Sequence, residues 1–174
     1  MRWKDKLIKD LVLLSKFLTD NTFERVMNEK NSLHLAIFSE PFLSLLLAGE
    51  KSMESRLSIN KLPPFRKVNV GDIVLVKKTG GGIVAIFEIE EVSFFSNLNP
   101  DVLENINNRY GKDLCWEYDP DFLSLKSTAK FCTIVKAKNL IRIPELHISK
   151  SDRTGWVIIR KGLRNTLFDY DSNK

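Results

Sequence analysis

The sequence predicts an α+β fold in which short strands and helices share one core. The first 29 residues carry apolar side chains at three- and four-residue spacing, typical of an amphipathic helix. Two apolar runs, Ile73–Val76 and Ile83–Val92, flank a glycine-rich stretch, which indicates a pair of strands joined by a turn. With 174 residues, 43% of them hydrophobic, the chain is long enough to bury the core of one domain.

The N-terminal segment, residues 1–30, is expected to form a helical extension that packs on the rest of the domain. The apolar stripe of a helix over residues 2–29 consists of Trp3, Leu7, Leu11, Leu14 and Leu18. A break is expected at residues 20–22, with a second short helical piece after it. Alternatively, the helix binds a protein partner, and exposure of the leucines in its stripe would support that interpretation. Its mixed charges make a membrane-surface helix the weaker interpretation.

The remaining elements follow in order within a main domain of residues 31–164, and residues 165–174 are expected to be a flexible tail. Apolar runs and turn residues predict the following strands and helices: a strand Leu33–Phe38, a helix Phe42–Ala48, a strand from Ser52, the two strands named above, a helix from Asn99 to Tyr110, a shorter helix after Pro120, and strands Phe131–Ala137 and Trp156–Arg160.

Charge is unevenly distributed along the chain, although the net charge is only +5. Residues 86–125 hold nine acids and two bases, whereas residues 126–164 hold ten bases and two acids. This asymmetry is compatible with a basic surface that faces nucleic acid beside an acidic flank. The two segments could equally neutralise each other in the fold. Charge alone leaves both interpretations open.

The two cysteines, Cys115 and Cys132, show no metal-binding spacing and stand beside apolar or aromatic residues. We therefore expect them to be reduced and packed, with the protein in the cytoplasm. His34 and His147 are far apart, so neither a metal nor another cofactor is predicted. No segment reaches the roughly 18–20 apolar residues that cross a bilayer, and no contact with a membrane is expected.

The segment GEKSMESR, residues 49–56, concentrates two bases and two acids at a predicted helix-to-strand turn. Gly49 is expected to end the helix in a left-handed conformation. In a strand, Glu54 and Arg56 would share one face and could pair, with Lys51 at the strand entrance. Such a cluster is typical of a solvated surface but also of a site held on rigid elements.

A second notable segment is KKTGGG, residues 77–82, between two predicted strands. Its glycines would expose backbone amides and its lysines would attract phosphate. It lacks the spacing of a Walker loop and precedes a strand rather than a helix. A glycine-rich hairpin turn with solvated lysines is the simpler interpretation of these residues.

GEKSMESR matches the GxKxxExR signature of the ASCH family, a branch of the PUA-like β-barrel superfamily. Three further segments resemble that family in the same order: LHLAIFSEPFLSLLLAGEK, VNVGDIVLVKKTGGGIVAIFEIEEV and DRTGWVII. The resemblance covers roughly residues 33 to 160. It implies a PUA-like, ASCH-type mixed β-barrel with flanking helices, to which this chain adds an N-terminal helical segment.

The resemblance also implies a ligand cleft between the barrel and its first helix, and RNA or a modified nucleotide as the partner. Lys51 and Lys77 would meet phosphate or a polar base edge, whereas Glu54 would accept a base amino group and Arg56 would orient that carboxylate. The other ligand-binding candidates are Ser39, Lys78, Gly81, Trp116 and Arg153.

An enzyme is the alternative that the resemblance raises. ASCH relatives known as acetylcytidine amidohydrolases are thought to use a lysine, a threonine and a glutamate. Lys51 matches their lysine, but Glu54 stands three positions later, where those relatives carry the hydroxyl. A hydrolase acting on a modified nucleoside or on RNA would then use Lys51 to polarise the substrate and Glu54 as general base.

Overall fold

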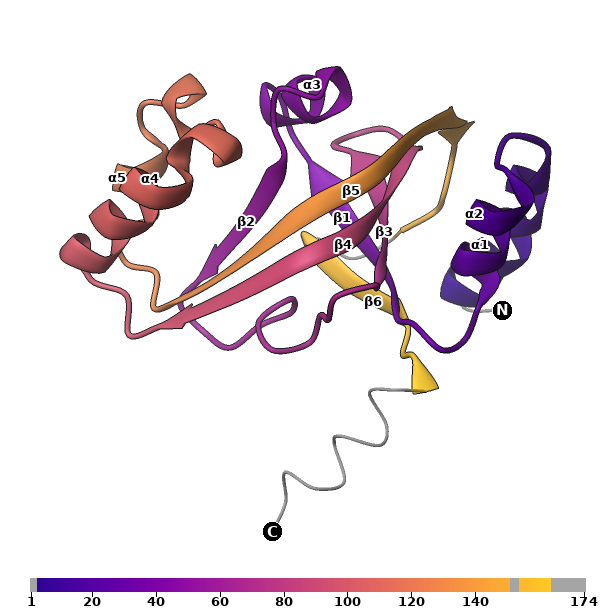
Figure 1. Ribbon diagram of the computed structural model, residues 1–174, viewed down its shortest axis with the longest axis horizontal. Coiled ribbons are helices and arrows are strands. Elements are labelled where there is room, and N and C mark those ends of the chain that lie inside the picture. The colour runs from indigo at the N-terminus through magenta and orange to yellow at the C-terminus, as the bar shows by residue number, and fades with distance from the viewer. Residues whose placement is uncertain (1–2, 151–153, 164–174) are drawn as a thin grey trace, which may run out of the picture.

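The computed structural model describes residues 3–150 and 154–163, and within them six strands form one mixed sheet. The strands lie in the order β2-β5-β4-β3-β1-β6, and all neighbours are antiparallel except β1 and β3 (Figure 1). Their bounds are β1 Leu33–Phe38, β2 Met53–Ser58, β3 Ile73–Lys78, β4 Ile83–Ser96, β5 Phe131–Leu146 and β6 Trp156–Arg160.

The helices flank the two ends of this sheet, with α1 and α2 at one end and α4 and α5 at the other (Figure 1). Their bounds are α1 Trp3–Asp10, α2 Asp20–Met27, α3 Phe42–Ala48, α4 Pro100–Leu114 and α5 Phe122–Leu125, with 3-10 turns η1 Leu11–Lys16 and η2 Trp116–Tyr118. None of the helices in the described part of the chain has the length and apolar character to span a bilayer.

Strands β4 and β5 are longer than the sequence predicts and curve the sheet into a half-barrel. They pair from Ile83 with Leu146 to Ser96 with Phe131. Three register shifts interrupt this ladder, and such bulges bend a strand and increase its twist. The added residues of β5 include Asn139, Pro144 and Glu145, which have weak strand preference. Pairing with β4 therefore decides their conformation.

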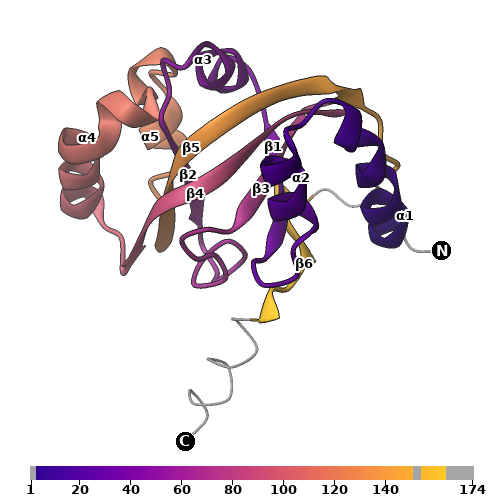
Figure 2. The ribbon, with the colours of Figure 1, turned by 45° about the vertical axis from the view of Figure 1, so that its right-hand side comes forward.

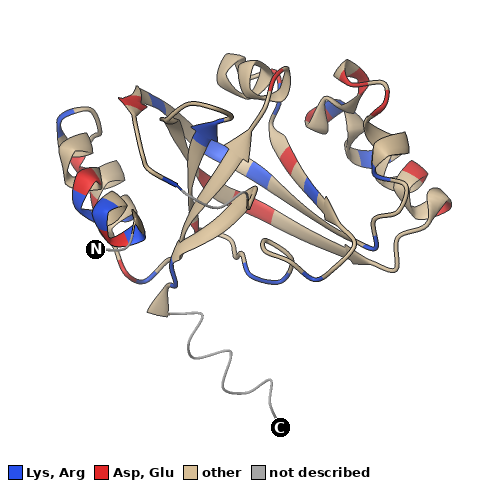
Figure 3. Ribbon diagram, turned by 180° about the vertical axis from the view of Figure 1, so that it is seen from behind, with Lys and Arg blue, Asp and Glu red and all other residues tan. Residues whose placement is uncertain are grey.

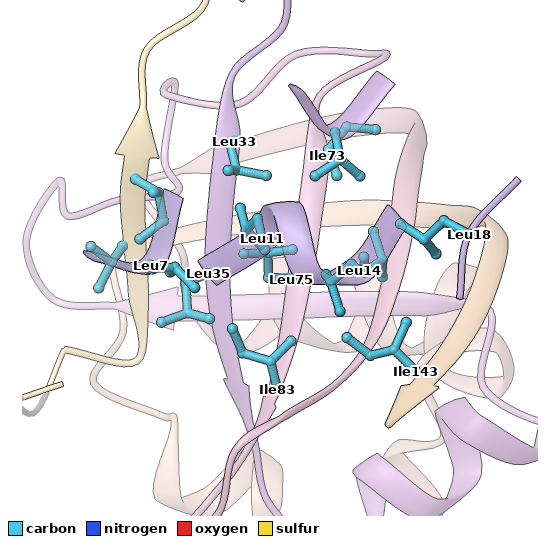
Figure 4. Packing of buried hydrophobic residues seen from close by; sticks show 14 residues of the cluster. Leu7, Leu11, Leu14, Leu18, Leu33, Leu35, Ile73, Leu75, Ile83 and Ile143 are labelled. Atoms are coloured by element: carbon cyan, nitrogen blue, oxygen red, sulfur yellow. The ribbon is translucent and has the colours of Figure 1, made fainter. Parts of the chain in front are cut away.

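The N-terminal segment covers one face of the sheet, on the side where β1, β3 and β6 lie (Figure 2). Figure 4 shows its leucines pointing onto Leu33, Leu35 and Leu75 of the strands. Leu7, Leu11 and Leu14 are all buried, so these side chains are unavailable to a protein partner.

The helical segment differs in detail from the expected one. Residues 11–16 form a 3-10 turn, and the chain breaks at residues 17–19 rather than at residues 20–22. Thr19 caps α2, because its side chain accepts a hydrogen bond from the Thr22 backbone N–H at 3.3 Å. Residues 20–22 therefore begin the second helix, although the sequence predicts a break there.

Two further clusters build the core on the other face of the sheet and under α4. Phe38, Phe87 and Trp156 pack with the leucines of α3 in the first cluster. In the second, Leu103 and Ile106 of α4 cover the pairing of β2 with β5. Both cysteines are free thiols and buried, which confirms their predicted packing.

The acidic and basic segments meet across β4 and β5. Lys136 lies 2.8 Å from Glu90 and 2.9 Å from Glu91, and Lys138 lies 3.1 Å from Glu88. Blue and red bands accordingly occur together on the strands in Figure 3. At these residues the two segments neutralise each other, as one of the two interpretations of the sequence predicted.

Candidate ligand cleft

The turn between α3 and β2 has the geometry that the sequence predicts. Gly49 adopts a left-handed conformation, φ +81°, and its N–H bonds to the carbonyls of Leu45 and Leu46. The next residues remain attached to the same helix end, since the Lys51 N–H donates to Leu45 at 3.1 Å. The GxK part of the motif is therefore held rigidly at the entrance of β2.

Lys51, Glu54 and Arg56 form one ionic cluster, which confirms the expected pairing. The Glu54 carboxylate lies between the two cations: Oε1 is 2.9 Å from Arg56 Nε, and Oε2 is 3.3 Å from Lys51 Nζ. The contact with Arg56 is an ion pair rather than an aligned hydrogen bond. Because the Glu54 side chain is only 11% exposed, the two cations fix where its oxygens point.

Lys51 lies beneath the site rather than in its wall. The residue is 3% exposed, and Nζ donates to the Leu114 carbonyl of α4 at 2.7 Å. The same ammonium lies 5.1 Å from the centre of the Phe42 ring. With Glu54 as a third neighbour, Lys51 joins α3, α4 and β2.

Arg56 connects the two edges of the sheet. It belongs to β2, at one edge, yet Nη2 donates to the Ile37 carbonyl of β1 at 2.7 Å and Nη1 to the Gly155 carbonyl before β6 at 3.3 Å. Its guanidinium lies 5.3 Å from the ring of Phe38 and 5.5 Å from that of Trp156. Arginine suits this position because its planar fork both donates and stacks.

A cleft of about 740 Å³ opens over this cluster, between α3, β2 and the α5 region. This volume lies within the roughly 300–1,000 Å³ of pockets that take small ligands. Glu54 and Arg56 contribute to its floor. The other side chains that line it include the apolar or aromatic residues Phe38, Phe42, Leu57, Leu62, Pro63, Pro64, Phe122, Leu125 and Trp156, and the polar residues Ser39, Ser55, Ser58, Asp119, Lys126 and Thr154.

The orientation of Trp156 in the cleft is set by a buried chain of hydrogen bonds. Trp156 Nε1 donates to Nδ1 of His34 at 3.3 Å, and His34 Nε2 lies 3.1 Å from Asp72 Oδ2. With the indole as donor, His34 carries its proton on Nε2 and donates to Asp72. Asp72 also accepts the backbone N–H groups of Ser32 and Asn69. His34 is thus a hydrogen-bonded structural residue.

Both cysteines lie close to the ionic cluster and are kept neutral by their surroundings. Burial raises the pKa of Cys132 to about 12, and the nearby charge of Glu54 adds to the effect. Burial also raises the pKa of Cys115, although the charge of Lys51 opposes that shift. Neither thiol is therefore ionised near neutral pH, and neither has the character of a nucleophile.

Contrary to expectation, Lys77, Lys78 and Gly81 do not line the cleft. Lys77 follows Ile73 and Leu75 in the alternation of β3, on the face covered by the N-terminal segment, and Nζ donates to the carbonyls of Lys78 and Gly81. Burial and the charge of Lys150 lower the pKa of Lys77. Residues 77–82 therefore form a hairpin turn whose carbonyls accept hydrogen bonds from the Lys77 ammonium.

Three other candidates have different outcomes. Ser39 does line the cleft. Trp116 is buried behind the wall, where Nε1 donates to Ser55 Oγ at 3.1 Å and the indole packs on Phe122 at 5.1 Å. Arg153 lies outside the described residues.

Most of the apolar wall of the cleft is not predicted by the sequence. Phe42, Phe122 and Leu125 come from short helices, and Leu62 to Pro64 come from a loop, so no periodic pattern links them. The available signal was weak: Phe42 and Phe122 each begin a short helix that follows a proline. Only the folded chain brings these residues together along one cleft, where the rings of Phe42 and Phe122 lie 5.8 Å apart.

The fold is similar to that of solved ASCH structures. The ASCH protein of Zymomonas mobilis, ZmASCH, aligns with a TM-score of 0.58 and 12% identity, over 84% of this chain and 96% of that chain. A serine-to-alanine variant of ZmASCH aligns with a TM-score of 0.59 and 10% identity, over 82% and 98% of the two chains. No protein-family model and no curated protein matches the sequence. The structural likeness shows the fold and confirms the predicted α+β, ASCH-type architecture, in which the mixed sheet forms a half-barrel.

Proposed function

We propose that this chain, which has the ASCH fold, binds a nucleotide or a modified nucleoside in the cleft above Glu54. One observation supports this most: a carboxylate held between two cations faces a cleft whose walls are aromatic and aliphatic. Fixed polar groups inside an apolar cavity are the usual means by which a protein orients a small planar ligand.

The chemistry of the floor suits a nucleobase that carries an amino group. A carboxylate only accepts hydrogen bonds, and Glu54 has about four acceptor positions, of which the two cations occupy part. An exocyclic amine or a ring N–H could therefore donate to Glu54. Aromatic side chains such as Phe38, Phe42 and Trp156 line the cleft, and a base that stacks on an aromatic ring gains about 1–3 kcal/mol.

The hydrolase alternative has less support from the arrangement of these residues. Lys51 already contacts Leu114, Glu54 and the Phe42 ring, and it is buried below the floor. Ser55, the nearest hydroxyl along the chain, borders the cleft, but it lies on the other face of β2 from Glu54 and its Oγ accepts from Trp116. A group that polarises the substrate must contact it, and Lys51 lies below the floor rather than in the lining of the cleft.

Calorimetric titration with cytidine, acetylcytidine and adenosine tests the proposal. We expect at least one of these probes to bind, and Glu54→Gln to weaken that binding about tenfold to a hundredfold. The expected loss corresponds to the roughly 1.5–3 kcal/mol of a hydrogen bond to a charged group. A Glu90→Gln variant, which changes a carboxylate on β4 outside the cleft, serves as the control and is expected to bind like the wild type.

Chromatography of the same mixtures separates binding from turnover. Deacetylation of acetylcytidine that Lys51→Ala abolishes would replace the binding proposal with the amidohydrolase. Equal affinity of wild type and Glu54→Gln for every probe that binds would show that the carboxylate does not contact the ligand. Circular dichroism of each variant verifies that the fold is retained.

A further inference from the structure

A group of five cations lies beside one end of the cleft. It consists of Lys61, Arg66 and Lys67 from the loop between β2 and β3, and Lys126 and Lys130 from the segment between α5 and β5. We call it the basic rim. Four of these side chains are exposed, and Lys126 is half-buried. Figure 3 shows blue segments along the loop between β2 and β3.

The basic rim is one surface, although its two segments are far apart in the sequence. Phe131 is the common neighbour: the ammonium of Lys61 lies 5.7 Å from its ring, and the ring of Phe65 lies 4.9 Å away. Lys130 is tied to the end of β2, because its N–H donates to the Ser58 carbonyl at 2.9 Å. The side chain of Arg66 lies over the Phe65 ring at 5.7 Å.

The rim is continuous with the cleft. Lys126 itself lines the cleft, as do Leu62, Pro63 and Pro64, which stand between Lys61 and Arg66 in the chain. A ligand that extends out of the cleft past these residues would therefore meet the rim next.

The charge of the rim is not compensated by nearby carboxylates. Within the described part of the chain, none of its five cations lies within ion-pair distance of an acid. The chain segments that carry them, residues 59–69 and 122–138, contain no Asp or Glu. By contrast, Lys136 and Lys138, further along β5, are paired with glutamates of β4.

We infer that the basic rim binds the phosphodiester backbone of a single-stranded polynucleotide whose base occupies the cleft. This inference rests on the proposed function and narrows its ligand to a nucleotide within a strand. The cleft lining carries two acids and two bases, so it offers no net attraction to phosphate. The rim supplies that attraction, and phosphate contacts position a strand while the cleft contacts its base.

The test compares a fluorescein-labelled single strand of about ten nucleotides with the nucleoside that binds best. Affinity for the strand is measured by anisotropy as KCl is raised, and each neutralised phosphate contributes a slope of about −0.7 in log affinity against log salt. Contacts to three to five phosphates therefore predict a slope of about −2 to −3.5. RNA and DNA of one sequence show whether the 2′-hydroxyl adds to binding.

Substitutions in the rim carry the main prediction. The double variant Lys61→Gln/Lys130→Gln should bind the strand at least tenfold more weakly and reduce the salt slope by about 1.4, two contacts at about 0.7 each. Nucleoside affinity should stay unchanged, because neither residue lines the cleft. The matched control is Lys9→Gln/Lys16→Gln, which removes the same charge from exposed positions on the N-terminal segment.

The two proposals fail in different ways in this experiment. Equal strand binding by the rim variant and its control would overturn the inference and leave nucleoside binding intact. Polyglutamate that binds as tightly as RNA and DNA would also overturn it, because the rim would then attract any polyanion or an acidic protein. If neither the strand nor any nucleoside bound, the proposed function of the cleft would be refuted instead.

Discussion

At the residue scale, the cluster of Lys51, Glu54 and Arg56 depends on all three charges being present. Moving a charge out of water costs several kcal/mol, and only close opposite charges and hydrogen bonds offset that cost. Lys51 is 3% exposed and the side chain of Glu54 is 11% exposed. Bulk water therefore solvates neither charge well. Loss of one partner therefore costs more than loss of an equivalent surface pair.

We predict that Lys51→Met lowers the free energy of unfolding by about 3 kcal/mol, since Glu54 loses a cation and the Leu114 carbonyl loses its donor. The double variant Lys51→Met/Glu54→Gln should recover part of that loss, because no carboxylate is then left without its cation. Urea unfolding of the two single variants and the double variant gives the coupling energy.

The control for this cycle is Lys136→Met, which breaks the more exposed pairs with Glu90 and Glu91. Surface pairs of this kind contribute about 0–1 kcal/mol. Strictly additive effects of Lys51→Met and Glu54→Gln would contradict the proposed coupling.

At the scale of elements, the N-terminal segment is a structural layer of the domain. Its leucines contact β1, β3, β4 and β5 in one cluster, so removal of a side chain leaves a cavity against the sheet. Adjacent residues of the 3-10 turn have opposite surroundings: Leu11 is 0% exposed, whereas Val12 is 52% exposed. This contrast provides a matched pair of substitutions.

Leu11→Ala is expected to destabilise the protein by about 2–5 kcal/mol, the range for a buried leucine that leaves a cavity. Val12→Ala should change stability by less than about 0.5 kcal/mol, as for other surface substitutions. Thermal and urea denaturation measure both. If Leu11→Ala were as stable as Val12→Ala, the segment would not be an integral layer of the core.

At the scale of the whole molecule, one side chain closes the half-barrel where the backbone ladder does not. The sheet ends with β2 at one edge and β6 at the other. Arg56 spans this gap through the carbonyls of Ile37 and Gly155, and the rings of Phe38 and Trp156 hold its guanidinium. The residue that orients Glu54 therefore also joins the two edges of the fold.

Arg56→Lys should consequently destabilise the fold although it conserves charge. A lysine cannot donate in two fixed directions, so at least one of the two half-buried carbonyls loses its partner, at a cost of about 1–3 kcal/mol. Arg109→Lys on the exposed side of α4, where the guanidinium contacts Tyr110, is the matched control and should be near neutral. Equal unfolding midpoints in urea for the two variants would exclude a closing role for Arg56.

The sequence determined the local elements and the position of the site along the chain. Gly49 ends its helix and the Glu54–Arg56 pair forms because each depends on neighbours within a few residues. The apolar run of β6 also predicts its bounds, although the strand pairs with the distant β1. The order of the four ASCH-like segments predicted the fold class, and the structural likeness to ZmASCH confirms it.

Which distant residues line the candidate cleft follows from packing rather than from any local pattern. Lys77 turns to the face covered by the N-terminal segment, while Phe122 and Lys126 come to the cleft from beyond α4. Lys51 lies below the floor of the cleft, where its ammonium donates to the Leu114 carbonyl of α4. These outcomes depend on sheet curvature and on packing between remote segments, which leave no periodic trace in the sequence. The motif thus contributes the floor of the cleft, and the remote segments complete its lining.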